Sequence, residues 1–171
     1  MKMKALITLI ILSLVFLFNC SKYKEEAPFF DGLTLEYKWG LMKKVYEVKD
    51  IDKGFRILQT RVSKGLGNKT EEFFVDEYGK VYKSTEKAYV GHFSPMWIPV
   101  NKMDVGSEYN DGFTIIKKDR WKIWDVLVSE CPMSGEKTYF EANTGYLVGK
   151  KGKGYEIYLI NTNADIPTIE E

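Results

Sequence analysis

Side chains that could perform catalysis are sparse in this chain of 171 residues. His92 is the only histidine, which excludes a cluster of imidazole metal ligands. The glycine-rich stretch 149–154 lies between two expected strands, so we interpret it as a hairpin rather than a phosphate-binding loop. We therefore expect no metal and no cofactor, and we interpret His92 as a surface loop residue.

Carboxylates are the remaining candidates for catalysis, because two of them can perform general acid–base chemistry without other groups. Adjacent acids such as Glu71 and Glu72 point to opposite faces of a strand and do not converge. Asp125 is different, since an expected long strand over 121–130 places it on the same face as Leu127. An acid on such an apolar face can be buried and its pKa perturbed. Asp125 with a second carboxylate is thus the alternative, enzymatic interpretation.

Tryptophans suggest a binding surface instead. Trp121 and Trp124 are three residues apart, so they would lie on opposite faces of the expected strand, and one could contact a ligand or partner. Trp97 lies in the proline-flanked segment 91–99, which could equally cover that second face. Trp97, Trp121, Trp124 and Asp125 form our candidate ligand- or partner-binding set.

An apolar run at 5–18 follows two lysines at the start of the chain. It is too short to span a hydrocarbon core about 30 Å thick, which needs about 20 residues, and is typical of a secretory signal. The run ends in Leu17-Phe18-Asn19-Cys20, which resembles the lipobox of bacterial lipoproteins in Leu17 and Cys20 and departs from it in Phe18 and Asn19. An uncleaved anchor or a signal cut elsewhere are the alternatives.

The lipobox resemblance implies that Cys20 is diacylated and becomes the first residue after cleavage. Each buried methylene of an acyl chain contributes about 0.8 kcal/mol, so several chains hold a small domain on a bilayer. The resemblance also implies a cell-envelope location, and Ser21 after the cysteine favours the outer membrane, facing the periplasm or the cell surface. After lipidation only Cys131 remains, which excludes an intramolecular disulfide, and we expect its thiol to be buried.

Charge composition argues against nucleic acid as a partner. The chain has 25 basic and 24 acidic residues, interspersed rather than clustered. Aromatic residues make up 15% of the chain and alternate with Val, Ile and Thr in short runs, which predicts an all-β fold. About ten strands joined by short turns must pair antiparallel. We expect a meander that forms a small barrel or an open half-barrel, with charged residues facing water.

The predicted organisation is a signal at 1–19, a lipidated solvated tether at 20–30, a β-rich domain at 31–162 and a polar tail at 163–171. Two tandem repeats are a further hypothesis, because four residues recur at an offset of 66. The set Phe74, Gly79, Val81 and Tyr89 matches Phe140, Gly145, Leu147 and Tyr155.

The expected function is that of a membrane-anchored envelope lipoprotein, a non-enzymatic binding or assembly module for a protein partner or an amphiphile. The alternatives are a cell-envelope hydrolase that uses Asp125 and a structural subunit of a surface complex.

Overall fold

A computed structural model describes residues 25–63, 65, 67–110 and 112–169, and the lipobox with Cys20 lies outside them. Within these residues the chain forms one antiparallel sheet of eleven strands, together with two short 3-10 helices, η1 and η2. The strands are β1 (Thr34–Trp39), β2 (Met42–Ile51), β3 (Gly54–Val62), β4 (Lys69–Val75), β5 (Val81–Ser84), β6 (Glu108–Asn110), β7 (Phe113–Trp121), β8 (Trp124–Glu130), β9 (Lys137–Glu141), β10 (Leu147–Gly152) and β11 (Tyr155–Thr162). The prediction of an all-β meander of about ten strands is confirmed.

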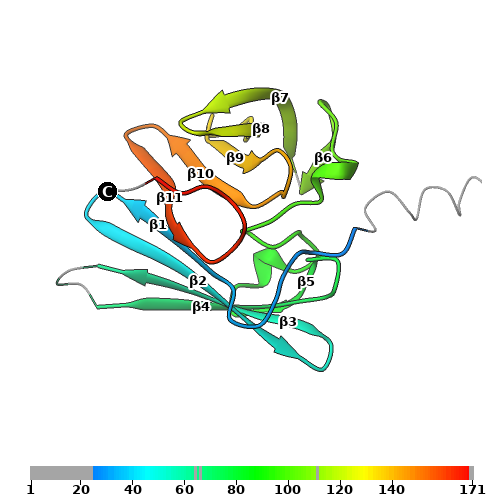
Figure 1. The fold of residues 1–171 in the computed structure, drawn as a ribbon, viewed down its shortest axis with the longest axis vertical. Helices are drawn as coiled ribbons and strands as arrows, with labels where there is room; N and C mark the ends of the chain where they lie inside the picture. The colour runs from blue at the N-terminus through cyan, green and yellow to red at the C-terminus, as the bar shows by residue number, and fades with distance from the viewer. Residues whose placement is uncertain (1–24, 64, 66, 111, 170–171) are drawn as a thin grey trace, which may run out of the picture.

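The sheet is open. Its strand order is β5-β4-β3-β2-β1-β11-β10-β9-β8-β7-β6, and no ladder joins the edge strands β5 and β6 within the described residues. Figure 1 shows the strands β2 to β4 as a lower layer and β7 to β10 as an upper one, with the green connection between β5 and β6 at the side where the layers part. The half-barrel is therefore the form that the chain adopts.

The connection contains η1 (Lys87–Tyr89) and η2 (Val100–Lys102) and ties the two layers together. Its Ser94 amide donates to the carbonyl of Gly79 in the β4–β5 turn at 2.8 Å, and its Ile98 amide donates to the carbonyl of Gly145 in the β9–β10 turn at 3.1 Å. The expected cover over one end of the sheet is thus present as a bridge between two hairpins.

Trp97 is the centre of this bridge. Its side chain is fully buried, and its indole N–H donates to the Thr144 carbonyl at 2.8 Å. Gly79 and Gly145 approach it so closely that a Cβ atom on Gly79 would lie 2.8 Å from the indole ring and one on Gly145 would lie 2.0 Å from the Ile98 carbonyl oxygen. Both glycines have a positive φ, of 74° and 79°, which glycine adopts most readily.

The segments flanking the sheet are packed rather than solvated. Ala27 and Phe29 are buried, and the Ala27 amide donates to the Glu77 carbonyl at 2.8 Å. The tether prediction is therefore wrong for residues 25–30, because Phe29 adds an aromatic ring to the Trp97 cluster at 6.0 Å. In the predicted polar tail, Ile166 is likewise buried against the core.

The topology fits two tandem meanders. The strands β1 to β5 and β6 to β10 follow one another in the same direction across the sheet, and β11 lies between the two sets. The corresponding hairpins β4–β5 and β9–β10 each have a register irregularity, and each places its turn glycine, Gly79 or Gly145, against Trp97. Tyr89 and Tyr155 do not correspond, since one lies in η1 and the other in β11.

Candidate functional site

Polar side chains line part of the inner face of the sheet, contrary to the prediction that charged residues face water only. Tyr46 on β2 pairs with Gln59 on β3, which pairs with Glu71 on β4, so all three point to one face. Their exposed fractions are 0%, 3% and 4%. The adjacent row towards the β1–β2 turn is formed by Lys44, Arg61 and Lys69.

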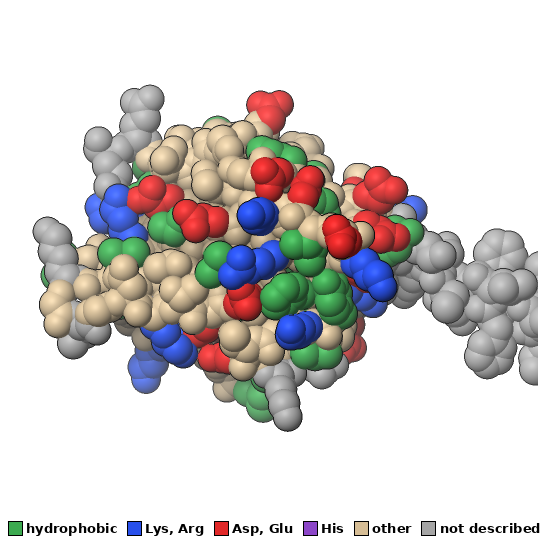
Figure 2. All heavy atoms as spheres, turned by 90° about the horizontal axis from the view of Figure 1, so that it is seen from below, with side chains coloured by type: hydrophobic (Ala, Val, Ile, Leu, Met, Phe, Trp, Pro, Cys, Tyr) green, Lys and Arg blue, Asp and Glu red, His purple; other side chains and the backbone are tan. Residues whose placement is uncertain are grey.

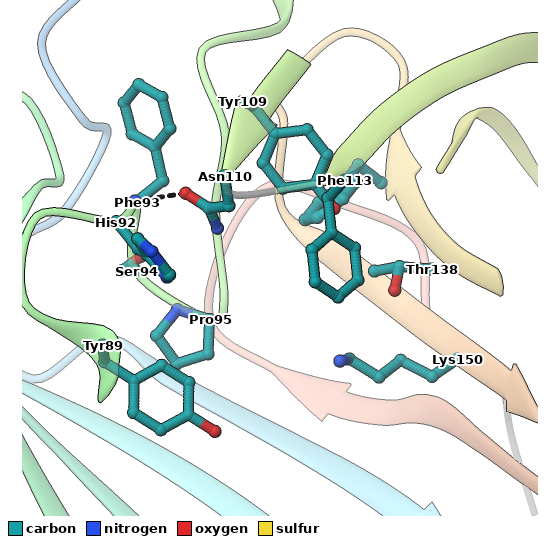
Figure 3. A pocket seen from close by; sticks show the side chains of 11 residues that line it. Tyr89, His92, Phe93, Ser94, Pro95, Tyr109, Asn110, Phe113, Thr138 and Lys150 are labelled. Atoms are coloured by element: carbon teal, nitrogen blue, oxygen red, sulfur yellow. Dashed lines mark hydrogen bonds between the residues drawn. The ribbon is translucent and has the colours of Figure 1, made fainter. Parts of the chain in front are cut away.

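A cavity of about 100 Å³ lies between the connection and the inner face of the second meander. Its walls are mainly aromatic, formed by Tyr89, Phe93, Tyr109, Phe113 and Phe140. Figure 3 shows the rings of Tyr89, Tyr109 and Phe113 around a hollow into which Lys150 from β10 points, with Thr138 from β9 beside it. A space of this size is smaller than the cavity of about 150 Å³ that holds a benzene ring, so it accommodates an apolar group smaller than a full ring.

The cavity is fixed at its rim by two hydrogen bonds. Phe93 donates its amide to the side-chain oxygen of Asn110 at 2.8 Å, drawn as the dashed line in Figure 3. The hydroxyl of Tyr109 bonds that of Ser129 at 3.0 Å. The connection is thus held against β6, and Tyr109 on β6 against β8, so the walls belong to both ends of the open sheet.

Several buried polar atoms at this site have no hydrogen-bond partner among the described residues. They include the hydroxyls of Ser94 and Thr138, which line the cavity, the hydroxyl of Tyr46 and the Nε of Arg61. Each of these groups can donate a hydrogen bond. A buried polar group without a partner costs about 1–3 kcal/mol, so a bound acceptor would stabilise the site.

Ion pairs neutralise most charges on the inner face. Glu71 accepts from Arg61 at 2.8 Å and from Lys69 at 2.9 Å. Glu136, in the turn after β8, accepts from Lys150 at 3.1 Å. It also accepts a hydrogen bond from the hydroxyl of Tyr155.

Lys44 makes no ion pair among the described residues: its amine lies over the Tyr46 ring, 5.3 Å from the ring centroid, and Glu71 and Glu136 attract it without a direct contact. Burial, with repulsion by Arg61, lowers the pKa of Lys44 to about 8. Burial raises the pKa of the Tyr46 hydroxyl. Burial alone would raise the pKa of Glu136, but Lys150 and the hydrogen bond from Tyr155 outweigh it and lower that pKa.

The structure does not bring the predicted binding residues to this cavity. Trp97 and Trp124 are 0% and 1% exposed, so neither ring is an accessible contact surface. The expected strand over 121–130 is wrong, because Lys122, at φ 54°, turns the chain between β7 and β8. Trp121 and Trp124 are therefore cross-strand partners with stacked rings 5.7 Å apart. They share one face, contrary to the expectation of opposite faces.

Trp121 lies on the outer face, stacked on Tyr139 at 4.3 Å and packed over Gly149. Asp125 is exposed, and its cross-strand partner is Arg120. Asp125 does share a face of β8 with the buried Leu127, as expected, but it lies beside the turn at the start of the strand, and the carboxylate is therefore exposed rather than buried.

Two further side chains differ from their expected settings. Cys131 is partly exposed in the turn after β8 instead of buried, and hydrogen bonds from Ser134 and Met133 lower its pKa. His92 is partly buried and lines the cavity, so it is more than a surface loop residue. The described residues contain no group of three or more His, Cys, Asp or Glu side chains that could hold a metal.

Comparison with known proteins finds no matching family model, no matching curated protein and no matching solved structure. In the part of the chain that the structure describes, no helix has the length and hydropathy needed to cross a bilayer. The site must therefore be interpreted from its own geometry.

Proposed function

We propose that this protein is a membrane-anchored envelope lipoprotein whose half-barrel binds an amphiphilic small molecule without chemical conversion. The observation that carries the proposal is the cavity, which has aromatic walls and unpartnered buried hydroxyls at Ser94 and Thr138. Ligand sites are typically concave and apolar with a few well-placed polar groups. Lipidation at Cys20, as the lipobox implies, would hold the domain at a bilayer of the cell envelope.

The position of the cavity supports a binding role. It lies beneath the connection, which is hydrogen-bonded to both hairpin turns and packs through Trp97. Preformed walls lower the entropic cost of binding, because few side chains need to be ordered. A rigid aromatic pocket thus suits recognition of a small apolar group.

A protein partner is the second candidate, and two exposed side chains favour it. Leu41 and Met133 are 97% and 96% exposed, at the β1–β2 and β8–β9 turns. These turns lie at the same end of the strands, since β1 and β8 run in the same direction, and residues 25–30 lie at the opposite end of the strands. An assembly contact would then form on the side remote from the membrane anchor.

Surface charge supports the expectation that nucleic acid is not a partner. The face in Figure 2 carries acidic and basic side chains side by side, with small apolar groups between them. Arg56 and Glu72 are one such ion pair. Nucleic-acid binding by backbone contacts needs an extended basic surface.

The test is recovery of ligand from native membranes. We expect organic extraction and mass spectrometry of the purified protein to yield a small amphiphile. A Thr138→Leu variant, which fills the cavity, should yield at least about tenfold less, because even one or two unfavourable methyl contacts change affinity by that factor. An Asp125→Asn variant is the matched control and should retain the ligand. Equal recovery from the Thr138→Leu variant would argue against the cavity as the site.

The Asp125→Asn variant also tests the hydrolase alternative. If Asp125 were catalytic, an envelope phenotype that depends on the protein should disappear in this variant. We expect the phenotype to be unchanged, because Asp125 is exposed and lies outside the cavity lining.

A further inference from the structure

Lys44 is the one ammonium group of the inner polar rows whose charge lacks a carboxylate partner among the described residues. Arg61 and Lys69 contact Glu71, and Lys150 contacts Glu136. Lys44 lies next to Arg61 across the strands β2 and β3, and its amine is held against the Tyr46 ring. Lys44 is partly buried, and the attraction of Glu71 and Glu136 does not offset its desolvation and the repulsion by Arg61, so its charge would be stabilised by a further anion.

The polar atoms without a partner agree in their chemistry. The Nε of Arg61 can only donate a hydrogen bond, and the hydroxyls of Tyr46 and Thr138 can donate one each. Together with Lys44 they form a set that lacks an acceptor. A cationic ligand would add repulsion to Lys44 and would leave the Arg61 donor unsatisfied.

The polar rows and the cavity belong to one interior. Lys44 interacts electrostatically with Glu136, which is the ion-pair partner of the cavity residue Lys150. The Tyr46 ring lies 5.7 Å from that of Tyr37, whose hydroxyl donates to the Leu147 carbonyl on β10, the strand of the cavity residue Lys150. The ring of the cavity residue Tyr89 lies 5.2 Å from that of Phe73, which shares β4 with Glu71. A ligand that fills the cavity therefore contacts Lys150 and Thr138 and lies beside the strands that carry the polar rows.

We propose that this interior binds a small carboxylic acid, with its carboxylate held by Lys44 and the neighbouring donors and its aromatic or short aliphatic body in the cavity. This inference rests on the proposed binding function and names the class of its ligand. The cavity volume of about 100 Å³ excludes a long acyl chain and suits a short chain, while a single ring, which needs about 150 Å³, would lie partly outside it.

The experiment compares three probes of one shape: 3-phenylpropanoate, 3-phenylpropan-1-ol and 3-phenylpropylammonium. Binding to the full-length protein in phosphatidylcholine nanodiscs is measured by calorimetry at pH 7, with empty nanodiscs as the blank. We expect the acid to bind about 10- to 100-fold more tightly than the alcohol, because hydrogen bonds to charged groups are the stronger ones. The ammonium probe should bind most weakly.

Variants of two neighbouring lysines distinguish acid binding at the inner site from acid binding to the protein surface. Lys44→Met should reduce acid affinity to that of the alcohol, whereas Lys43→Met should leave it unchanged, because Lys43 lies on the other face and pairs with Glu36. Lys44→Arg keeps the charge and should retain binding. Unfolding temperatures of all three variants confirm that each is folded.

The pH dependence is a second signature of Lys44. Acid affinity should fall as pH rises above about 8, as the amine loses its proton, and Lys44→Arg should abolish this fall. The groups that face Lys44 are Tyr46 on its own strand, Arg61 on β3, Glu71 on β4 and Glu136 after β8. Burial raises the pKa of the Tyr46 hydroxyl, and the pKa values of both glutamates are lowered, so all three keep their charge state between pH 7 and 9.

Each outcome has a distinct meaning. Equal affinity for acid and alcohol, or full acid binding by Lys44→Met, would overturn the assignment of an acid. Failure of all three probes would also overturn it, while ligand recovery from native membranes would still support the cavity as a binding site. Loss of the wider binding function is shown separately, by extraction that yields no small molecule from the wild type.

Discussion

Replacing Gly145 by alanine should disrupt the bridge between the two meanders. Gly145 has φ +79°, and an added Cβ would lie 2.0 Å from the Ile98 carbonyl oxygen and 2.9 Å from the Trp97 indole nitrogen. The left-handed backbone alone costs a non-glycine residue about 1–2 kcal/mol. The contact must in addition displace the Trp97 segment, which weakens the buried hydrogen bond from its indole to the Thr144 carbonyl. A buried donor without a partner costs a further 1–3 kcal/mol, roughly.

Gly154→Ala is the matched control. Gly154 has φ +82°, and no described atom lies within 4 Å of its Cβ position, so it carries the same backbone cost without the contact. A loss of 1 kcal/mol lowers the unfolding temperature by about 2–4 °C in a chain of this length. We expect a decrease of about 2–8 °C for Gly154→Ala and about twice that for Gly145→Ala.

The assay is thermal unfolding followed by circular dichroism and by tryptophan fluorescence. Fluorescence should change more in Gly145→Ala than in Gly154→Ala before unfolding, since Trp97 lies against the altered turn. Equal decreases in unfolding temperature for the two variants would refute the reasoning, because the packing of Ile98 against Gly145 would then contribute nothing.

Three further predictions concern other parts of the molecule. Lys44→Met should stabilise the unliganded protein by about 3 kcal/mol at pH 7, since the pKa of Lys44 is lowered in the folded state from 10.5 to about 8 and one pKa unit corresponds to about 1.4 kcal/mol. Between the folded-state and unfolded-state pKa values of Lys44 the unfolded protein binds more protons, so wild-type stability rises with pH from about 8 to 10.5. The difference in unfolding temperature between the wild type and Lys44→Met should therefore shrink over this range, and a constant difference would contradict the prediction. Glu141→Ala should cost about 2 kcal/mol in urea unfolding, because the buried carboxylate accepts from the Asn143 and Thr144 amides at 3.0 and 2.7 Å; a loss as small as that of exposed Asp125→Ala would count against it. Deleting 163–171 should shift tryptophan emission to longer wavelength, since the Trp124 indole donates to the Pro167 carbonyl at 2.8 Å; unchanged emission would show that the tail leaves Trp124 covered.

The strands could be predicted from the sequence wherever glycine marks a turn. Gly54, Gly79, Gly112 and Gly145 all have positive φ at or beside a hairpin turn, and the strands between them alternate apolar and polar residues as expected. The turn at Lys122 was missed because a lysine at φ 54° carries no such signal, and the error placed Trp121 and Trp124 on opposite faces of one strand.

The candidate site could be predicted much less well. Alternation separates the two faces of a strand, but it does not show where the inner face ceases to be apolar. Lys44 and Glu71 are two residues from the buried Tyr46 and Phe73, so alternation places them on the inner face, whereas their charge alone predicts exposure to solvent. The pairing register of β2, β3 and β4 is what brings the polar residues together, since it makes Tyr46, Gln59 and Glu71 cross-strand neighbours. Trp97 was singled out from its proline-flanked segment, but its packing between two distant glycines depends on pairings that no local pattern encodes.

The place of β11 has a consequence for the order in which the fold can be completed. Among the described strands it is the last to be synthesised, yet it occupies the middle of the sheet and is the strand through which β1 is joined to β10. Until Tyr155–Thr162 leaves the ribosome, β1 and β10 are unpaired on the side that β11 later occupies, and a strand of another chain could pair with them. Closing a loop of more than a hundred residues is also slow, which delays the finished half-barrel.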